Sequence, residues 1–263
     1  MFGASPEKRQ AQSADAGLKS AFQGLLEPQQ HFYQYRRVYR LQKVKAVFLA
    51  ILISAFSSWA NSPAVKADFA YILNLPQVKS SPKVSNVHSW QDFLASTLQK
   101  TEIDSVRSVN HFFNDMLEFN ADLAIWKQSD FWASPVDSLI VGQADCEDYA
   151  IGKYISLLAM GVEESKLRFV YVKATRPNGK APQAHMVLAY YPSPSASPFI
   201  LDNLNPTLLP ASKRPDLRPV FSFNGDSLWL RAGSSSSESQ SKNNLSLWRE
   251  LLQRLQRQGI TLI

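Results

Sequence analysis

The stretch "GQADCEDYAIGKYISLLAMG", residues 142–161, decides the fold we expect, because it joins a reactive side chain to an apolar helical run. It contains Cys146, the only cysteine of the 263-residue chain. The residues that follow are apolar on most sides, which predicts a buried helix from about 146 to 160. Gly161 comes directly after the last apolar position, as glycine often does at the end of a helix. Three acidic residues flank the cysteine: Asp145, Glu147 and Asp148.

A strand pattern replaces the helical one after this segment. "KLRFVYVKAT" (166–175) alternates and is rich in β-branched and aromatic residues, and "QAHMVLAYYP" (183–192) is the returning strand. The Asn178-Gly179 pair between them is a strong hairpin signal. "FILDNL" (199–204) is expected to be a third strand, and further short strands follow within 219–231. We therefore predict an antiparallel sheet.

Along the chain, helices are expected both before and after the strands of this sheet. The apolar spacing predicts a helix at 89–99, capped by Ser89, and an amphipathic helix at 102–119. The segment 130–145 is interpreted as a loop-rich approach to the cysteine, and an amphipathic helix at 245–256 closes the chain. Helices, then an antiparallel sheet, then a terminal helix predict the α+β class.

The first 64 residues have a different character. A basic stretch at 36–45, an apolar run at 46–56 and small residues at 57–64 follow one another in the order of a secretory signal peptide. We predict that residues 1–64 are a polar N-terminus plus signal peptide, which makes the periplasm the leading compartment. Membrane anchoring through an uncleaved segment is the alternative, although the apolar run is short for a membrane span.

Residues 65–263 are predicted to form one domain, with a mobile Ser-rich segment near 233–244. Residues 1–64 hold 8 Lys/Arg and 3 Asp/Glu, which leaves 20 and 19 for the remainder. The domain is therefore nearly neutral, and the net charge of +6 does not indicate nucleic-acid binding. A single cysteine also excludes an intramolecular disulfide and a cysteine-rich zinc site.

The residues suggest cysteine chemistry with three partners. Cys146 falls at the start of the buried helix, where the helix dipole and unpaired N–H groups favour a thiolate. His185 lies in the second predicted strand and Asp202 in the third, and adjacent antiparallel strands can place them side by side. A Cys146–His185–Asp202 triad is thus one interpretation. In this interpretation, the helix terminus and an imidazolium favour the Cys146 thiolate more than the neighbouring carboxylates, which point elsewhere, oppose it.

A purely structural interpretation of the same residues stays open at this point. A buried cysteine often acts as a small hydrophobic residue. A histidine in a strand is commonly a packed or surface residue, and Asp202 in "LDNLNP" has the setting of a turn-forming aspartate. Composition and spacing do not choose between the triad and these alternatives.

Several separated blocks resemble the bacterial transglutaminase-like cysteine proteinases, in order, over roughly 89–256. The resemblance implies a papain- or transglutaminase-like fold in which the cysteine helix packs on the sheet. It implies that Cys146 is the nucleophile, His185 the general base and Asp202 the residue that orients it. The blocks that carry it are "DFWASPVDSLIVGQADCEDYAIGKYISLLAMGV", "KLRFVYVKA", "QAHMVLAYY", "LDNL" and "FSFNGDSLWL".

The resemblance also implies a calcium cofactor. Family members depend on calcium, and Asp145 and Glu147 match positions implicated there, with Asp148 a plausible third ligand. Calcium takes several oxygen ligands and favours clustered carboxylates, so the chemistry agrees. The alternative is that Asp145 is the helix N-cap and that the other two acids interact with the helix dipole. Both interpretations can hold together.

For function, the resemblance implies a periplasmic cysteine endopeptidase. Its substrate would be the N-terminal region of a large surface adhesin, whose release promotes biofilm dispersal. An inner-membrane cyclic-di-GMP receptor would sequester the protease through its periplasmic domain. Two alternatives stay open: a transglutaminase or amidase that performs acyl transfer on a cell-envelope substrate, and a non-catalytic periplasmic interaction module.

Overall fold

The structure is a computed structural model that describes residues 64–96, 100–176, 180–224, 228–230 and 237–263. Several sequence-based predictions fall outside these residues. They are the basic and apolar stretches within residues 1–63, the hairpin turn at Asn178-Gly179, and residues 233–236 of the Ser-rich segment.

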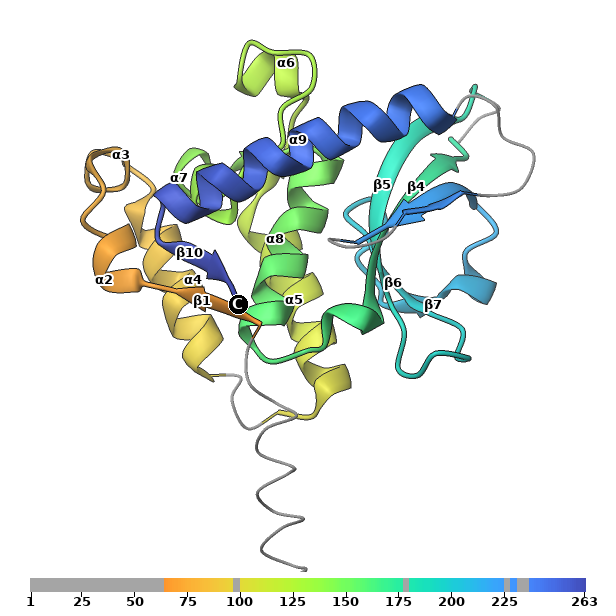
Figure 1. Ribbon diagram of the computed structural model, residues 1–263, viewed down its shortest axis with the longest axis horizontal. Coiled ribbons are helices and arrows are strands. Elements are labelled where there is room, and N and C mark those ends of the chain that lie inside the picture. Colours follow the sequence, from red (N-terminus) through yellow and green to blue (C-terminus); the bar gives the residue numbers. More distant parts are fainter. Residues whose placement is uncertain (1–63, 97–99, 177–179, 225–227, 231–236) are drawn as a thin grey trace, which may run out of the picture. The chain divides into compact units, whose positions relative to one another are not determined.

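Helices dominate the first part of the described chain and strands the second, with one long helix near the end (Figure 1). The helices are α2 (Phe69–Ile72), α3 (Pro76–Lys79), α4 (Val84–Ser96), α5 (Glu102–Met116), α6 (Asp122–Ile125), α7 (Pro135–Val141), α8 (Cys146–Ala159) and α9 (Ser237–Arg257), with 3-10 turns η1 (Glu164–Lys166) and η3 (Ala211–Lys213). The strands are β1 (Val65–Ala67), β2 (Glu118–Phe119), β3 (Gln143–Ala144), β4 (Leu167–Ala174), β5 (Gln183–Tyr190), β6 (Phe199–Leu201), β7 (Leu209–Pro210), β8 (Leu217–Phe223), β9 (Leu228–Leu230) and β10 (Ile260–Leu262). This order confirms the predicted α+β class.

An antiparallel sheet carries one half of the candidate site. Its strand order is β7-β6-β5-β4-β8-β9, so β5 lies inside the sheet between β6 and β4. The β4–β5 register pairs Val172 with His185, and the β5–β6 register pairs Leu188 with Leu201. These registers bring the middle of β5 close to the end of β6, where the chain continues into Asp202.

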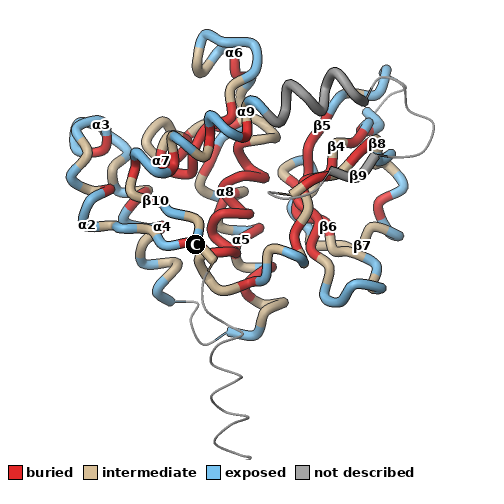
Figure 2. Tube along the Cα trace, viewed as in Figure 1, coloured by how far each residue is buried: buried red, intermediate tan, exposed pale blue. Residues whose placement is uncertain are grey.

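Helix α8 is the central element of the fold. It packs against β5 on one side and against α5 and α7 on others (Figure 1). Its residues from Asp148 to Leu158 are all buried, as Figure 2 shows along the length of the helix. A helix that is apolar on most sides is stable only when it is enclosed in this way, so the sequence pattern and the observed position agree.

Close contacts hold α8 against its helical neighbours. Gly152 of α8 lies against the ring of Phe113 from α5, and a Cβ at this position would come within 2.5 Å of a ring carbon. Trp90 of α4 donates a hydrogen bond of 2.9 Å from its indole N–H to the Ser156 hydroxyl, and both side chains are buried. These contacts fix the position of α8 relative to α5 and α4, and therefore the position of its first turn.

The first and last strands of the described chain pair with each other. Strand β1 pairs antiparallel with β10, and Val65 lies opposite Leu262. Helix α9 places Trp248 on an aromatic cluster with Phe169 of β4 and Tyr154 of α8, with ring centroids 5.6 and 5.8 Å from the Trp248 ring. The terminal helix therefore packs on the domain.

Several predicted boundaries differ from the structure. The strand predicted at 199–204 ends at Leu201, so Asp202 follows β6 instead of lying within it. The helix predicted from Ser89 begins at Val84, and the helix predicted to reach 119 ends at Met116, because Leu117 is extended and leads into β2. The predicted loop at 130–145 contains α7, which starts at a capping box formed by Ser134 and Asp137.

The terminal helix also begins earlier than predicted. It starts at Ser237, within the Ser-rich segment, whereas the apolar periodicity begins only at 245. No helix in the described ranges has the length and apolar character that crossing a membrane requires.

We predict that Gly152→Ala destabilises the protein, although alanine normally favours a helix by about 1 kcal/mol over glycine. The added methyl group would meet the Phe113 ring at 2.5–2.9 Å, so the helices must separate. We expect a loss of about 1–3 kcal/mol in the free energy of unfolding, measured by urea denaturation. The double variant Gly152→Ala/Phe113→Leu should recover part of this loss. Equal or greater stability of Gly152→Ala would contradict the contact.

Candidate active site

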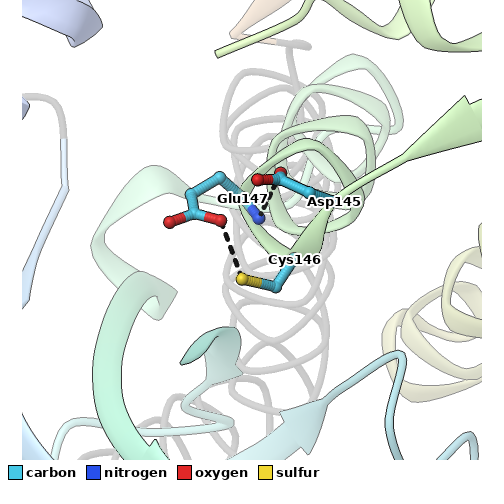
Figure 3. Close-up of side chains that lie close together, drawn as sticks. All are labelled: Asp145, Cys146 and Glu147. Carbon is cyan, nitrogen blue, oxygen red and sulfur yellow. Dashed lines mark hydrogen bonds between the residues drawn. The ribbon is translucent and has the colours of Figure 1, made fainter. Parts of the chain in front are cut away.

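The cysteine is the first residue of α8. Asp145 precedes it as the N-cap, and its side chain accepts hydrogen bonds of 3.1 and 3.3 Å from the backbone N–H groups of Glu147 and Asp148. The alternative role predicted for Asp145, as helix cap, is therefore observed. The arrangement holds the partly exposed Cys146 at the positive end of a buried helix (Figure 3).

The immediate partner of the thiol is a carboxylate. Cys146 Sγ lies 2.7 Å from Glu147 Oε2, which accepts a hydrogen bond from the thiol (Figure 3). Burial raises the pKa of Cys146 well above its ordinary value, and the charges of Glu147 and Asp145 raise it further. In the triad interpretation of the sequence, these carboxylates point away from the sulfur. That expectation is wrong for Glu147, whose side chain folds back over the first turn.

The thiol also lies against strand β5. The backbone N–H of Met186 acts to lower the pKa of Cys146, against the larger effects of burial and the two carboxylates. Met186 directly follows His185 in β5, the strand that packs against α8. In the described part of the chain the thiol donates to Glu147, and no hydrogen bond joins it to His185.

His185 and Asp202 form a buried pair. His185 Nε2 lies 2.7 Å from Asp202 Oδ1, with side-chain exposures of 2% and 0%. Burial raises the pKa of Asp202, but hydrogen bonding to His185, the charge on His185 and a hydrogen bond from Arg214 together lower it to about 2. An ionised Asp202 only accepts hydrogen bonds, so His185 Nε2 carries the proton and Nδ1 is the basic nitrogen.

A second group of carboxylates surrounds the start of α8. Oxygen atoms of Asp122, Asp145 and Asp148 lie within 4.8 Å of one another, and so do ligand atoms of Asp145, Cys146 and Glu147. Burial and the charge of Asp145 raise the pKa of Asp122 to about 7. Burial and the charge of Glu147 raise the pKa of Asp145 to about 8. Burial, again with the charge of Asp145, raises the pKa of Asp148 well above its usual range.

These carboxylates are incompletely satisfied by protein donors. Asp122 Oδ2 accepts from the Phe131 N–H at 2.6 Å, and Asp148 Oδ1 accepts from the Ala133 N–H at 2.7 Å. The other oxygen of each, Asp122 Oδ1 and Asp148 Oδ2, is buried without a hydrogen-bond partner in the described part of the chain. Clustered anionic oxygens with unused acceptor capacity suit a hard cation such as calcium, so the residues present fit the implied metal.

Asp122 is the one member of this cluster that the sequence analysis did not identify. The parallel pairing of β2 with β3 places Glu118 beside Gln143, which brings the chain after β2 next to the start of α8. A pairing of two residues on each side leaves no recognisable sequence pattern. No local signal distinguishes Asp122 from other acidic residues.

The fold and this site define a transglutaminase-like cysteine proteinase. The family model described as "Bacterial transglutaminase-like cysteine proteinase BTLCP" matches residues 81–215, and the chain belongs to this family.

The solved structures similar to the chain include three of Legionella pneumophila LapG. LapG is 38% identical to this chain over 70% of it and 95% of its own length, with a TM-score of 0.58. A calcium-bound form is 38% identical over 70% and 97% of the two chains, with a TM-score of 0.57. An EGTA-treated form is 39% identical over 70% and 95%, with a TM-score of 0.58. The comparison with curated proteins found no match. The predicted fold is thereby confirmed.

We predict that the metal-free protein loses stability as the pH rises from 5 to 7. The folded-state pKa values of Asp122 and Asp145 are about 7 and about 8, above the ordinary value of 3.8. The folded state therefore binds more protons than the unfolded state in this range, and its advantage disappears as the pH rises. The lowered pKa of Asp202, about 2, acts only at more acidic pH.

Thermal unfolding in EGTA at fixed ionic strength measures this effect. We expect the melting temperature to fall between pH 5 and 7, and to fall less steeply in Asp122→Asn, whose amide does not titrate. A melting temperature that rises across this range would show that the cluster does not titrate as described.

Proposed function

We propose that this protein is an exported, calcium-dependent cysteine endopeptidase that cleaves the N-terminal region of a large surface adhesin. The observation that supports it most strongly is the buried pair, at 2.7 Å, of His185 on β5 and Asp202 directly after β6, because β5 packs against α8, the helix that begins with Cys146. Family membership supports the reaction class. The adhesin, and the biofilm dispersal that its release would promote, rest on the resemblance to the adhesin-releasing members of this family.

The reaction follows from the roles of the three side chains. The Cys146 thiol gives its proton to Nδ1 of His185, and the thiolate attacks the carbonyl carbon of the scissile peptide bond. The protonated His185 then donates this proton to the leaving amine, which leaves a thioester on Cys146. Water, deprotonated by His185, hydrolyses the thioester and restores the thiol. Asp202 keeps His185 in the required tautomer and orientation throughout.

Calcium would be held by Asp145, Glu147 and Asp148, with Asp122 as a further ligand. A bound calcium ion would supply positive charge beside the thiol, where carboxylates otherwise oppose its ionisation. Ligation would also engage the Glu147 carboxylate, which in this structure accepts a hydrogen bond from Cys146. Calcium-bound and EGTA-treated structures among the LapG matches support this part of the proposal.

The cellular setting is proposed from the N-terminal sequence and the resemblance. The basic, apolar and small stretches within residues 36–64 support export to the periplasm, with membrane anchoring as the alternative. There the protease would meet the adhesin and the periplasmic domain of an inner-membrane cyclic-di-GMP receptor, which would inhibit it by sequestration.

We predict that Cys146→Ala abolishes cleavage of the N-terminal segment of a co-encoded adhesin. We expect Asp202→Asn to lower kcat by roughly a thousandfold or more, because the amide supports the wrong histidine tautomer. Cleavage is measured by mass spectrometry with saturating calcium. His111→Ala, on the exposed side of α5, is the matched control and should retain full activity.

The same assay separates the alternative functions. A fluorescent primary amine included in the reaction would be incorporated by a transglutaminase, whereas a protease cleaves one bond without incorporation. In cells, adhesin release that persists in Cys146→Ala would favour the interaction module and reject the enzyme.

We predict that EGTA inactivates the protease and that added calcium restores it. Because the carboxylates provide the binding charge, Glu147→Gln and Asp148→Asn should each weaken calcium binding by about tenfold or more. Titration calorimetry measures this binding, with Glu163→Gln, an exposed acid outside the cluster, as the control. If activity and melting temperature are the same in EGTA and in calcium, there is no functional calcium site.

A further inference from the structure

An arginine is buried directly behind the proposed orienting aspartate. Arg214 follows η3 and has an exposed fraction of 4%. Its Nη2 donates to Asp202 Oδ2 at 2.6 Å, and the exposed fractions of the two side chains in this ion pair are 3% and 0%. A buried ion pair requires further hydrogen bonds to offset the loss of hydration. Nε and Nη2 of Arg214 make such bonds, whereas Nη1 is buried without a hydrogen-bond partner among the described residues.

A second carboxylate fixes the plane of the guanidinium. Arg214 Nε donates to Asp216 Oδ1 at 3.0 Å, and Nη2 donates to Asp216 Oδ2 at 2.8 Å. Asp216 is partly exposed, with 44% of its side-chain surface accessible. Asp216 therefore holds the outer side of the guanidinium while the inner side meets Asp202.

The donors to Asp202 are divided between its two oxygens. Oδ1 lies against His185 Nε2 and accepts from the Leu204 N–H at 2.9 Å, whereas Oδ2 accepts from Arg214. The backbone carbonyl of Asp202 is anchored separately, by the Asn114 side-chain amide at 2.8 Å. With donors on both oxygens, the carboxylate cannot rotate without breaking a buried hydrogen bond. The oxygen that faces His185 is thereby fixed.

Arg214 is also the permanent positive charge near Asp202. The other charged or titratable groups that act on Asp202 are His185, Asp216 and Lys153 of α8. Burial lowers the pKa of Lys153 to about 7 against the charge of Asp202, so this lysine is only partly charged near neutral pH. An arginine side chain stays protonated throughout the accessible pH range.

We propose that Arg214 is a positioning residue of the protease, which holds Asp202 in the orientation that directs His185 toward Cys146. The proposal rests on the proposed function, because it assigns a role within that same triad. Arg214 does not contact the reacting atoms in this scheme, and its effect on the reaction passes through Asp202.

The decisive variants are Arg214→Met, which removes the charge and the donors, and Arg214→Lys, which keeps the charge but not the planar pair of donors. With saturating calcium, we expect Arg214→Met to lower kcat by about tenfold or more with little change in KM. Arg214→Lys should lie between this variant and the wild type. Arg218→Met, an exposed arginine on β8, is the matched control and should be unaffected. Asp216→Asn should have a small effect, because Asp202 keeps its donor.

The pH profile separates positioning from a merely structural role. Arg214→Met removes a buried positive charge beside the His185–Asp202 pair, so protonation of this pair begins at higher pH. The acid limb of kcat/KM should therefore move to higher pH in Arg214→Met and not in Arg218→Met. A variant that only reduces the folded fraction would lower the whole profile without moving this limb.

Alkylation of the cysteine tests the proposal without any substrate. Cys146 is the only cysteine, so the rate of reaction with iodoacetamide reports on this thiol alone, and saturating calcium keeps its acidic neighbours in the same state in both variants. A changed pH dependence of alkylation in Arg214→Met, in a protein that cleaves no adhesin, would keep the positioning role and reject the proposed substrate.

Folded Arg214→Met with wild-type kcat and wild-type alkylation profile would overturn the proposal. If Arg214→Met does not fold, Arg214→Lys decides, because it preserves charge and most of the volume. Wild-type kcat and acid limb in Arg214→Lys would then equally overturn it.

Discussion

The packing of α8 against β5 is the contact on which the candidate site depends. The helix contributes the thiol from its first residue, Cys146, and the strand contributes His185 from its third. Neither residue can be moved locally to correct an error in this packing, because the helix is buried and the strand is internal to the sheet. Phe113 leaves no room for a side chain at Gly152, about two turns along α8 from the thiol. This contact lies outside the site, but it helps to set the position of Cys146.

The protein contains two kinds of buried carboxylate with opposite electrostatics. Asp202 has its cations within the chain, and its pKa is lowered to about 2. For Asp122 and Asp145, burial and neighbouring carboxylates outweigh the hydrogen bonds that they accept, and their pKa values are raised to about 7 and about 8. A buried carboxylate thus has a cationic partner at Asp202, whereas Asp122 and Asp145 are surrounded mainly by other carboxylates. This difference supports the proposal that the acidic cluster binds an external cation, whereas Asp202 already has its cationic partner within the chain.

The sequence was sufficient where the relevant interaction is local or follows a period. Apolar periodicity predicts the buried helix after Cys146 and the strand that contains His185. The family resemblance adds that this helix packs on the sheet. Asp122 and Arg214 could not be found in this way, because a two-residue strand pair brings the first into place and a buried ion pair defines the second. The orientation of Glu147 depends on a side-chain rotamer, about which the sequence carries no signal.

These observations separate the two halves of the proposed machinery. On the cysteine side, the thiol donates to Glu147 and its pKa is raised by burial and by the carboxylates around it, so ionisation responds to whatever neutralises them. On the histidine side, His185 and Arg214 together lower the pKa of Asp202 through contacts internal to the chain. A cation that binds the acidic cluster would therefore change the nucleophile while the base and its orienting residue stay ready. The proposed control through calcium would then need no rearrangement of the fold, since the charge beside the sulfur and the contact of Glu147 with it are both local to the first turn of α8.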